Sequence, residues 1–150
     1  MQVFNGVDEL RAAKGSHLGT SEWMTVDQSQ VDMFADATGD HQWIHVDAEK
    51  AKDGPFGTTI AHGFLTLSLL PRLGWEIYKV ENVKMTINYG LNKVRFTSPV
   101  PVGSRIRGSI ELADVTDVDG GVQVLNKVTV EIEGAQRPAL VAESLLRYYD

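Results

Sequence analysis

The stretch "ATGDHQWIHVD" concentrates side chains that can transfer protons. Asp40, His41 and His45 surround the apolar pair Trp43 and Ile44. A turn across the five positions that separate Asp40 from His45 would let a carboxylate and an imidazole hold one water molecule. Trp43 and Ile44 are expected to bury themselves and so fix the orientation of both groups. The other interpretation is a solvated polar loop, since Asp after a helix-ending glycine often only forms a turn.

The same imidazoles would also permit a metal site. His41 and His45 are four positions apart, and Asp40, Asp47 and His62 could complete a set of zinc or iron ligands. A His-x-x-x-His pair needs a helix to align both rings, whereas the glycine before Asp40 is expected to end the preceding helix. We therefore expect no metal.

A nucleophilic serine or cysteine is not indicated. Cysteine is absent, which excludes a cysteine nucleophile, disulfides and thiolate metal sites. Ser68 lies in an apolar helical pattern without the Gly-x-Ser-x-Gly turn of serine hydrolases, so we expect a satisfied hydroxyl group there.

The segment "IAHGFLTLSLLPRLGWEIY" provides further candidates around Gly63. A backbone N–H near the start of a buried helix is an unpaired donor at the positive end of the helix dipole, suited to an oxygen that gains negative charge. Glycine also lets a ligand approach the backbone closely. The alternative is that Gly63 only permits tight packing of helix against sheet. His62 either lines the pocket or hydrogen-bonds within the loop.

The elements that must position these residues follow from hydrophobic periodicity. Thr25 is a candidate N-cap with Gln28 three residues later, and the helix that follows should stop at Gly39. A second helix, near residues 59–73, is apolar on nearly every side and should lie in the core, with Pro71 kinking or ending it. Three aromatic residues in or next to this segment are also expected in the core, namely Phe56, Phe64 and Trp75.

From Lys84 onward the pattern alternates between apolar and polar residues, which is typical of strands. Turn residues at Pro99–Gly103, Asp119–Gly121 and Gly134–Pro138 divide this part into four long antiparallel strands, the middle two joined by a tight hairpin. One buried helix with a curved antiparallel sheet around it is an α+β domain.

Composition limits the classes of function. A chain of 150 residues with 43% hydrophobic and 23% charged residues suits one compact domain over residues 1–150. The net charge of −6 gives no overall basic field, so we expect neither nucleic acid nor a membrane surface as a partner. Because no apolar stretch is long enough to span a bilayer, a cytoplasmic location is the expectation.

Three local motifs resemble the MaoC-like, (R)-specific enoyl-CoA hydratase family, which has the hot-dog fold. "FADATGDHQWIHVDAEKA" is similar to the family's hydratase motif, with Gly39, Asp40, Ile44 and His45 at the matching positions. "IAHGFLTLSLL" is similar to the start of its central helix, and "YGLNKVRFTSPVPVGSRIRG" to the strand and turn that follow. The chain departs from the family at "QW" before Ile44, where the common form has Asn-Pro.

The resemblance implies a single hot-dog domain that hydrates trans-2-enoyl-CoA reversibly to (R)-3-hydroxyacyl-CoA. It implies that Asp40 and His45 are the catalytic pair and favours Gly63 as the oxyanion donor, with His62 among the candidate substrate-binding residues. No cofactor is expected, because coenzyme A is part of the substrate. A homodimer with a continuous sheet is expected, and an acyl-carrier-protein thioester is an alternative substrate. The competing functions are a hot-dog acyl-CoA thioesterase and a non-catalytic acyl-binding domain.

Basic side chains on the expected strands would suit the phosphates of coenzyme A. Arg95, Arg105 and Arg107 lie on successive strands with Lys93 nearby, and they either meet these phosphates or form a solvated strand face. Asn92 either contacts the substrate or fixes a bend in its strand. Asn92 and Arg95 complete the candidate substrate-binding set.

Overall fold

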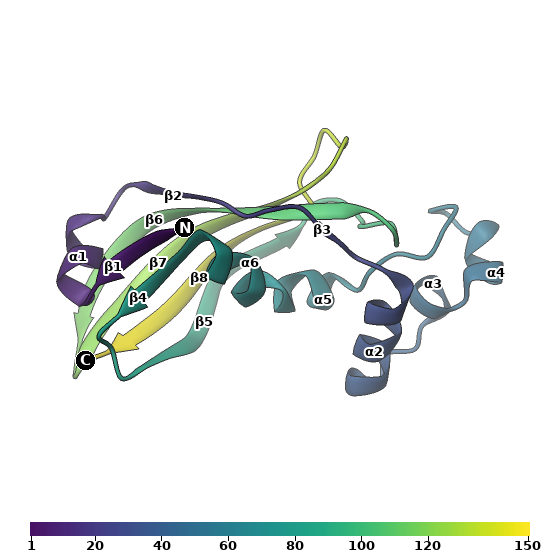
Figure 1. The fold of residues 1–150 in the computed structure, drawn as a ribbon. Helices are drawn as coiled ribbons and strands as arrows, with labels where there is room; N and C mark the ends of the chain where they lie inside the picture. Colours follow the sequence, from purple (N-terminus) through teal and green to yellow (C-terminus); the bar gives the residue numbers. More distant parts are fainter.

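The computed structural model describes residues 1–150 and shows a curved antiparallel sheet around one helical segment (Figure 1). The sheet order is β2-β6-β7-β8-β5, and β3 also pairs with β6. These strands span His17–Thr20 (β2), Met24–Thr25 (β3), Met85–Phe96 (β5), Arg105–Val118 (β6), Gly121–Ile132 (β7) and Leu140–Tyr149 (β8). The predicted α+β architecture, its four long strands and the β6–β7 hairpin are confirmed.

Alternate residues of β6 and β7 are buried on the face toward the helix. In β7, the buried positions are every second residue from Val122 to Ile132, and Asn126 is the one polar member of that row. A small parallel pair, β1 (Gln2–Asn5) with β4 (Tyr78–Glu81), lies beside the main sheet. Burial of one face of β6 and β7 gives these strands their register, since a slip by one residue would turn the apolar row outward. Strand β5 has no buried residue in the single chain.

The central helical segment begins and ends later than predicted. It consists of α5 (Gly63–Ser68) and α6 (Leu70–Ile77), so residues 59–62 lie outside it and its end passes Leu73. Proline has no N–H to donate to the carbonyl four residues earlier, which explains the irregularity just before Pro71. The regular helix is thus interrupted just before Pro71, as predicted. It resumes with Pro71 in the first turn of α6, where a missing N–H costs little.

The aromatic residues predicted for the core are exposed in the single chain, which corrects that expectation. Phe64 and Trp75 are 67% and 73% exposed, and Phe56 is 44% exposed. One side of α5 and α6 packs on the sheet through Leu65, Leu69 and Leu73, while Phe64 and Trp75 lie on the uncovered side. A helix that is apolar on every side can therefore have one side on the core and apolar residues on its other side that are exposed in the single chain.

The N-terminal part adds four short helices around the sheet. These are α1 (Val7–Ala12), α2 (Gln28–Thr38), α3 (Trp43–Val46) and α4 (Ala48–Lys52). Helices α2 to α4 lie beyond the end of the sheet, next to the start of α5 (Figure 1). The N-cap of α2 is Asp27, whose carboxylate accepts the Gln30 N–H at 2.9 Å, and not the predicted Thr25. Gly39 ends α2 as predicted, in the left-handed conformation with φ 80°.

No helix combines the length and the apolar character that a membrane crossing requires.

Candidate active site

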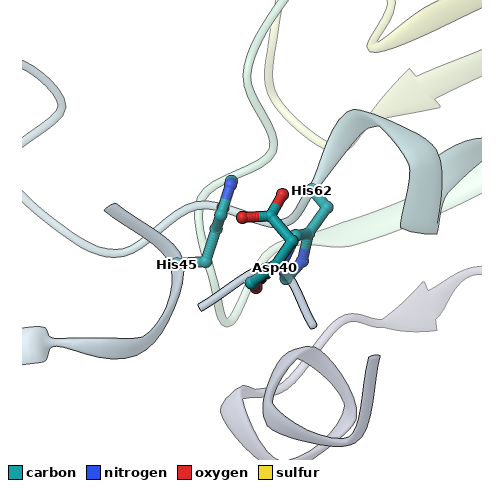
Figure 2. A group of neighbouring side chains, drawn as sticks. All are labelled: Asp40, His45 and His62. Atoms are coloured by element: carbon teal, nitrogen blue, oxygen red, sulfur yellow. Dashed lines mark hydrogen bonds between the residues drawn. The ribbon is translucent and has the colours of Figure 1, made fainter. Parts of the chain in front are cut away.

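Three side chains meet where α2, α3 and α5 approach one another: Asp40, His45 and His62 (Figure 2). One polar atom of each lies within 4.8 Å of those of the other two. Asp40 is exposed, whereas His45 and His62 are 7% and 3% exposed. The cluster therefore has a dry imidazole side and an open carboxylate side.

His45 is held in one orientation by the backbone around it. It lies on the short helix α3 and not in a loop as predicted, and its Nδ1–H donates to the carbonyl oxygen of Ile60 at 2.7 Å. A carbonyl only accepts hydrogen bonds, so Nδ1 carries the hydrogen and Nε2 of the neutral ring is unprotonated. This tautomer leaves Nε2 available to accept a proton or a hydrogen bond.

His62 has the opposite tautomer. Its Nε2–H donates to the backbone carbonyl of Asp40 at 2.9 Å, and its Nδ1 is buried without a hydrogen-bond partner. The His62 and His45 rings stack with centroids 3.8 Å apart. The Phe34 ring packs on His62 in a tilted orientation, with centroids 4.9 Å apart. The loop hydrogen bond predicted as one role of His62 is present, and it ties the backbone of Asp40 to the start of α5.

Asp40 is positioned by the turn that ends α2. Its N–H donates to the Thr38 hydroxyl at 3.4 Å, and its carboxylate accepts the Gln42 N–H at 3.3 Å. These long contacts leave most of the acceptor capacity of the carboxylate free. A water molecule beside Asp40 would thus meet an unsatisfied carboxylate next to the imidazole rings of His45 and His62.

A part-buried side chain that the sequence did not predict for the site, Gln28, holds the backbone of His45. The Gln28 amide donates to the backbone carbonyl of His45 at 2.8 Å and accepts the Thr59 hydroxyl at 2.7 Å. The sequence indicates only a capping role for Gln28. Its position in the first turn of α2 gives no sign of the contact with His45. Trp43 and Ile44, the predicted anchors, are only half-buried. The hydrogen bonds of His45 to the Ile60 carbonyl and to the Gln28 amide orient it more directly than Trp43 and Ile44 do.

His41 lies apart from the cluster. Its Nε2 is 2.9 Å from the Asp36 carboxylate, and this hydrogen bond raises the pKa of His41. Asp47 caps α4 by accepting the Lys50 N–H at 3.0 Å. The His41–His45 metal pair considered from the sequence does not form. The three side chains that could share a metal ion are instead Asp40, His45 and His62.

Gly63 presents a free backbone donor at the start of α5. No hydrogen bond is made by its N–H, as expected for the first residue of a helix. A Cβ atom at this position would lie 3.0 Å from two atoms of the Phe96 ring. Phe96 stands on β5 and also meets Phe64 edge-on at 5.9 Å. Gly63 therefore allows the Phe96 ring to pack closely against the start of α5, and its N–H has no partner within the chain.

The predicted basic residues separate into two groups. Arg105 forms a salt bridge with Glu133, and Arg107 forms one with Glu131. The charge of both arginines is therefore balanced on the face of the sheet. Arg95 has no carboxylate partner and donates to its own neighbour, the Val94 carbonyl, at 2.7 Å.

Asn92 lies on β5, where the register with β8 shifts between Leu91 and Lys93. This position fits the predicted bend. The structure brings neither Asn92 nor Arg95 into the Asp40 cluster, although Arg95 directly precedes the Phe96 ring that covers Gly63.

Comparisons with known proteins agree with this geometry. The family model described as MaoC like domain matches residues 9–133. The 3-hydroxyacyl-thioester dehydratase Z of Mycobacterium tuberculosis (strain ATCC 25618 / H37Rv) is 59% identical over 149 residues, covering 99% of each chain. Nodulation protein N of Rhizobium leguminosarum bv. viciae is 53% identical over 131 residues, covering 85% of this chain and 81% of that protein.

The fold has matches among solved structures. The R-hydratase PhaJ1 from Pseudomonas aeruginosa in its unliganded form gives a TM-score of 0.75 at 23% identity, over 100% of this chain and 90% of that one. Sheet, central helix and family match agree with the predicted hot-dog fold. The chain belongs to the MaoC-like hydratase and dehydratase family.

Proposed function

We propose that this hydro-lyase adds water reversibly to trans-2-enoyl-CoA and forms (R)-3-hydroxyacyl-CoA. The observation that carries the proposal is the cluster of Asp40, His45 and His62, whose polar atoms lie within 4.8 Å of one another, with His45 held by its Nδ1–H bond to the Ile60 carbonyl. The name of the mycobacterial relative, a 3-hydroxyacyl-thioester dehydratase, describes the reverse direction of the same reaction.

Hydration requires two proton transfers, one from the attacking water to a base and one from an acid to the alkene carbon C2. The water oxygen forms a bond to C3 while one member of the Asp40–His45 pair takes its proton, and the other member delivers a proton to C2. Negative charge that develops on the thioester oxygen between these events is stabilised by the Gly63 N–H. A proton taken from water and a proton given to carbon balance, so the reaction needs no cofactor.

The thioester carrier is proposed to lie along the edge of the sheet. Arg95 lacks a carboxylate partner and is the free guanidinium of the strand that borders Gly63, so it suits a phosphate of coenzyme A or of a carrier-protein arm. Asn92 at the β5 irregularity and His62 beside Asp40 complete the proposed substrate-binding set.

We propose a homodimer that pairs β5 with its copy. Strand β5 ends the sheet order and so has an unpaired edge. It also exposes Ile87, Tyr89 and Leu91 by 42–53%. Edge strands of this length and apolarity are normally covered in native proteins. The uncovered aromatic side of α5 and α6, with Phe64 and Trp75, would be buried by the same association.

The deciding assay follows the conjugated enoyl thioester absorbance of crotonyl-CoA together with the release of free thiol. The proposal predicts loss of absorbance without thiol and an (R)-configured product. Thiol release would support a hot-dog acyl-CoA thioesterase instead. Binding of acyl-CoA without conversion of enoyl, hydroxyacyl or saturated thioesters would support a non-catalytic acyl-binding domain.

Chelation separates the water-holding interpretation from a metal site. The same three groups, Asp40, His45 and His62, could ligate a divalent ion. If they hold water alone, dialysis against EDTA leaves the hydration rate unchanged. A loss of activity that returns with one added divalent metal would contradict the cofactor-free mechanism.

A further inference from the structure

Helix α3, which carries His45, is too short to hold its own shape. It spans only Trp43–Val46, which is about one helical turn. A single turn is unstable by itself, because nucleation fixes several backbone dihedral angles for one hydrogen bond. Contacts outside α3 must therefore fix its direction and, with it, the direction of the His45 ring.

The first residue of α3 is held by the turn that ends α4. A Cβ atom on Gly54 would lie 2.9 Å from Cζ3 and 3.0 Å from Cη2 of the Trp43 ring, so this ring lies directly against the Gly54 backbone. Gly54 is not among the glycines with positive φ, so its own backbone conformation does not require glycine. The missing side chain at this position serves the contact with Trp43.

The loop between residues 54 and 60 connects this contact to the His45 ring. The Ile60 N–H donates to the Ile44 carbonyl at 3.0 Å, and the Ile60 carbonyl accepts the His45 Nδ1–H at 2.7 Å. Helix α3 thus touches both ends of the loop, the start through Trp43 and the end through Ile44 and His45. If Trp43 moves relative to Gly54, α3 turns against the Ile60 segment and the His45 ring turns with it.

We propose that Trp43 and Gly54 form a steric clamp that positions His45 for catalysis. Both are positioning residues, since they act through His45 and not on the substrate. The inference rests on the proposed function for the reaction that it affects. It also gives a physical role to Trp43 in the pair "QW", where the chain departs from the common family form.

A proline at position 43 would fix the same turn through the backbone. Trp43 is the first residue of α3, the position where the fixed φ of proline suits a helix. Gln42 has φ −56° and ψ 138°, the extended conformation that a following proline requires. Trp43→Pro therefore removes the ring but restricts the backbone, whereas Trp43→Ala only removes the ring. The two variants separate positioning from packing.

The competing role for Trp43 is a surface contact with Lys50. The ammonium group of this exposed lysine lies 4.7 Å from the centroid of the Trp43 ring, within the range of a cation–π interaction. On that interpretation the ring stabilises α4 and has no effect on His45. Lys50→Gln removes this interaction and leaves the contact with Gly54 in place, so it is the matched control.

The first experiment measures kcat and KM for crotonyl-CoA after a methyl group is added at position 54. In the wild-type background, Gly54→Ala should lower kcat about tenfold, because a small misplacement of a catalytic group is costly. KM should stay within about twofold, since the substrate contacts are untouched. In the Trp43→Pro background the ring atoms are gone, so Gly54→Ala should change kcat by less than about twofold. Lys50→Gln should keep the wild-type kcat.

The second experiment compares the two substitutions of Trp43 itself. Trp43→Ala should lower kcat about tenfold, whereas Trp43→Pro should retain most of the activity. Equal losses in these two variants would assign the ring to packing and overturn the clamp. An equal effect of Gly54→Ala with and without the Trp43 ring would also overturn it. The comparison at position 43 still decides if Gly54→Ala does not fold.

A readout without substrate separates this inference from the proposed function. If the wild type hydrates no enoyl-CoA, the proposed function fails, and solvent exchange of the His45 Nδ1 proton, measured by NMR, tests the clamp. Because this proton is bonded to the Ile60 carbonyl, Gly54→Ala should speed its exchange about tenfold, and adding Trp43→Pro should reverse the effect. An exchange rate that Gly54→Ala leaves unchanged would overturn the inference, whatever the activity.

Discussion

Replacing Gly63 with alanine places a methyl group against the Phe96 ring, which allows the two roles of this glycine to be separated. The new Cβ would lie 3.0 Å from the ring, closer than ordinary contact, so the ring or the helix must shift. Phe96 is 46% exposed and can give way in part. We therefore expect Gly63→Ala to lower the free energy of unfolding by about 1–2 kcal/mol, within the usual cost of overpacking.

The same substitution made in a Phe96→Ala background should cost much less stability. Without the ring the three closest contacts of the methyl group are removed, so the coupling between the two sites should be about 1 kcal/mol. Urea denaturation of the two single variants and the double variant measures this coupling. An equal cost in both backgrounds would refute the contact as the reason for the glycine.

Activity distinguishes packing from oxyanion binding. If the thioester oxygen must approach the Gly63 N–H closely, the methyl group obstructs it with or without Phe96, and kcat/KM for crotonyl-CoA should fall about 10–100-fold in both backgrounds. If Gly63 only permits packing, the double variant should regain the activity of Phe96→Ala. Recovery of activity together with stability would thus refute the oxyanion role.

Three further predictions test other parts of the structure. Gln28→Ala leaves the buried carbonyl of His45 without its donor, so it should lower the unfolding free energy by about 1–3 kcal/mol in urea denaturation and also reduce kcat. The raised pKa of His41 means that its pairing with Asp36 stabilises the fold below the unfolded pKa of about 6.5 and is lost as pH rises through the folded pKa. In an NMR titration, Asp36→Asn should therefore lower the His41 pKa, and an unchanged value would contradict the pairing. Ile87→Glu places like charges at the proposed β5 edge and should yield a monomer in light scattering, whereas an intact dimer would exclude that edge.

The strands were predictable because the sequence patterns that specify them lie within the strands and turns themselves. Period-two alternation and the Asp-Gly-Gly turn define β6 and β7 from the sequence, and the structure places the hairpin between Val118 and Gly121. Helix ends were less accurate, since Thr25 and Asp27 are both good caps and only the fold decides between them. The proline in α6 suggested an end of the helix, yet its first-turn position makes it compatible with continuation.

The sequence predicted that Asp40 and His45 would lie close together, but it did not predict the contacts around them. The stacking of His62 on His45 joins residues 17 positions apart, and His45 also bonds to the Ile60 carbonyl. No local pattern encodes that approach. Likewise, apolar residues such as Phe64 do not reveal whether their own chain or a partner covers them.

We propose that Asp40 and His45 together activate water for addition to an enoyl thioester. The rate of crotonyl-CoA hydration by Asp40→Asn tests this role, with Asp36→Asn as the matched control for loss of one exposed carboxylate from the same region. We expect a loss of about 10²–10⁴-fold for Asp40→Asn and a near wild-type rate for the control. Hydration by Asp40→Asn at the wild-type rate would contradict it.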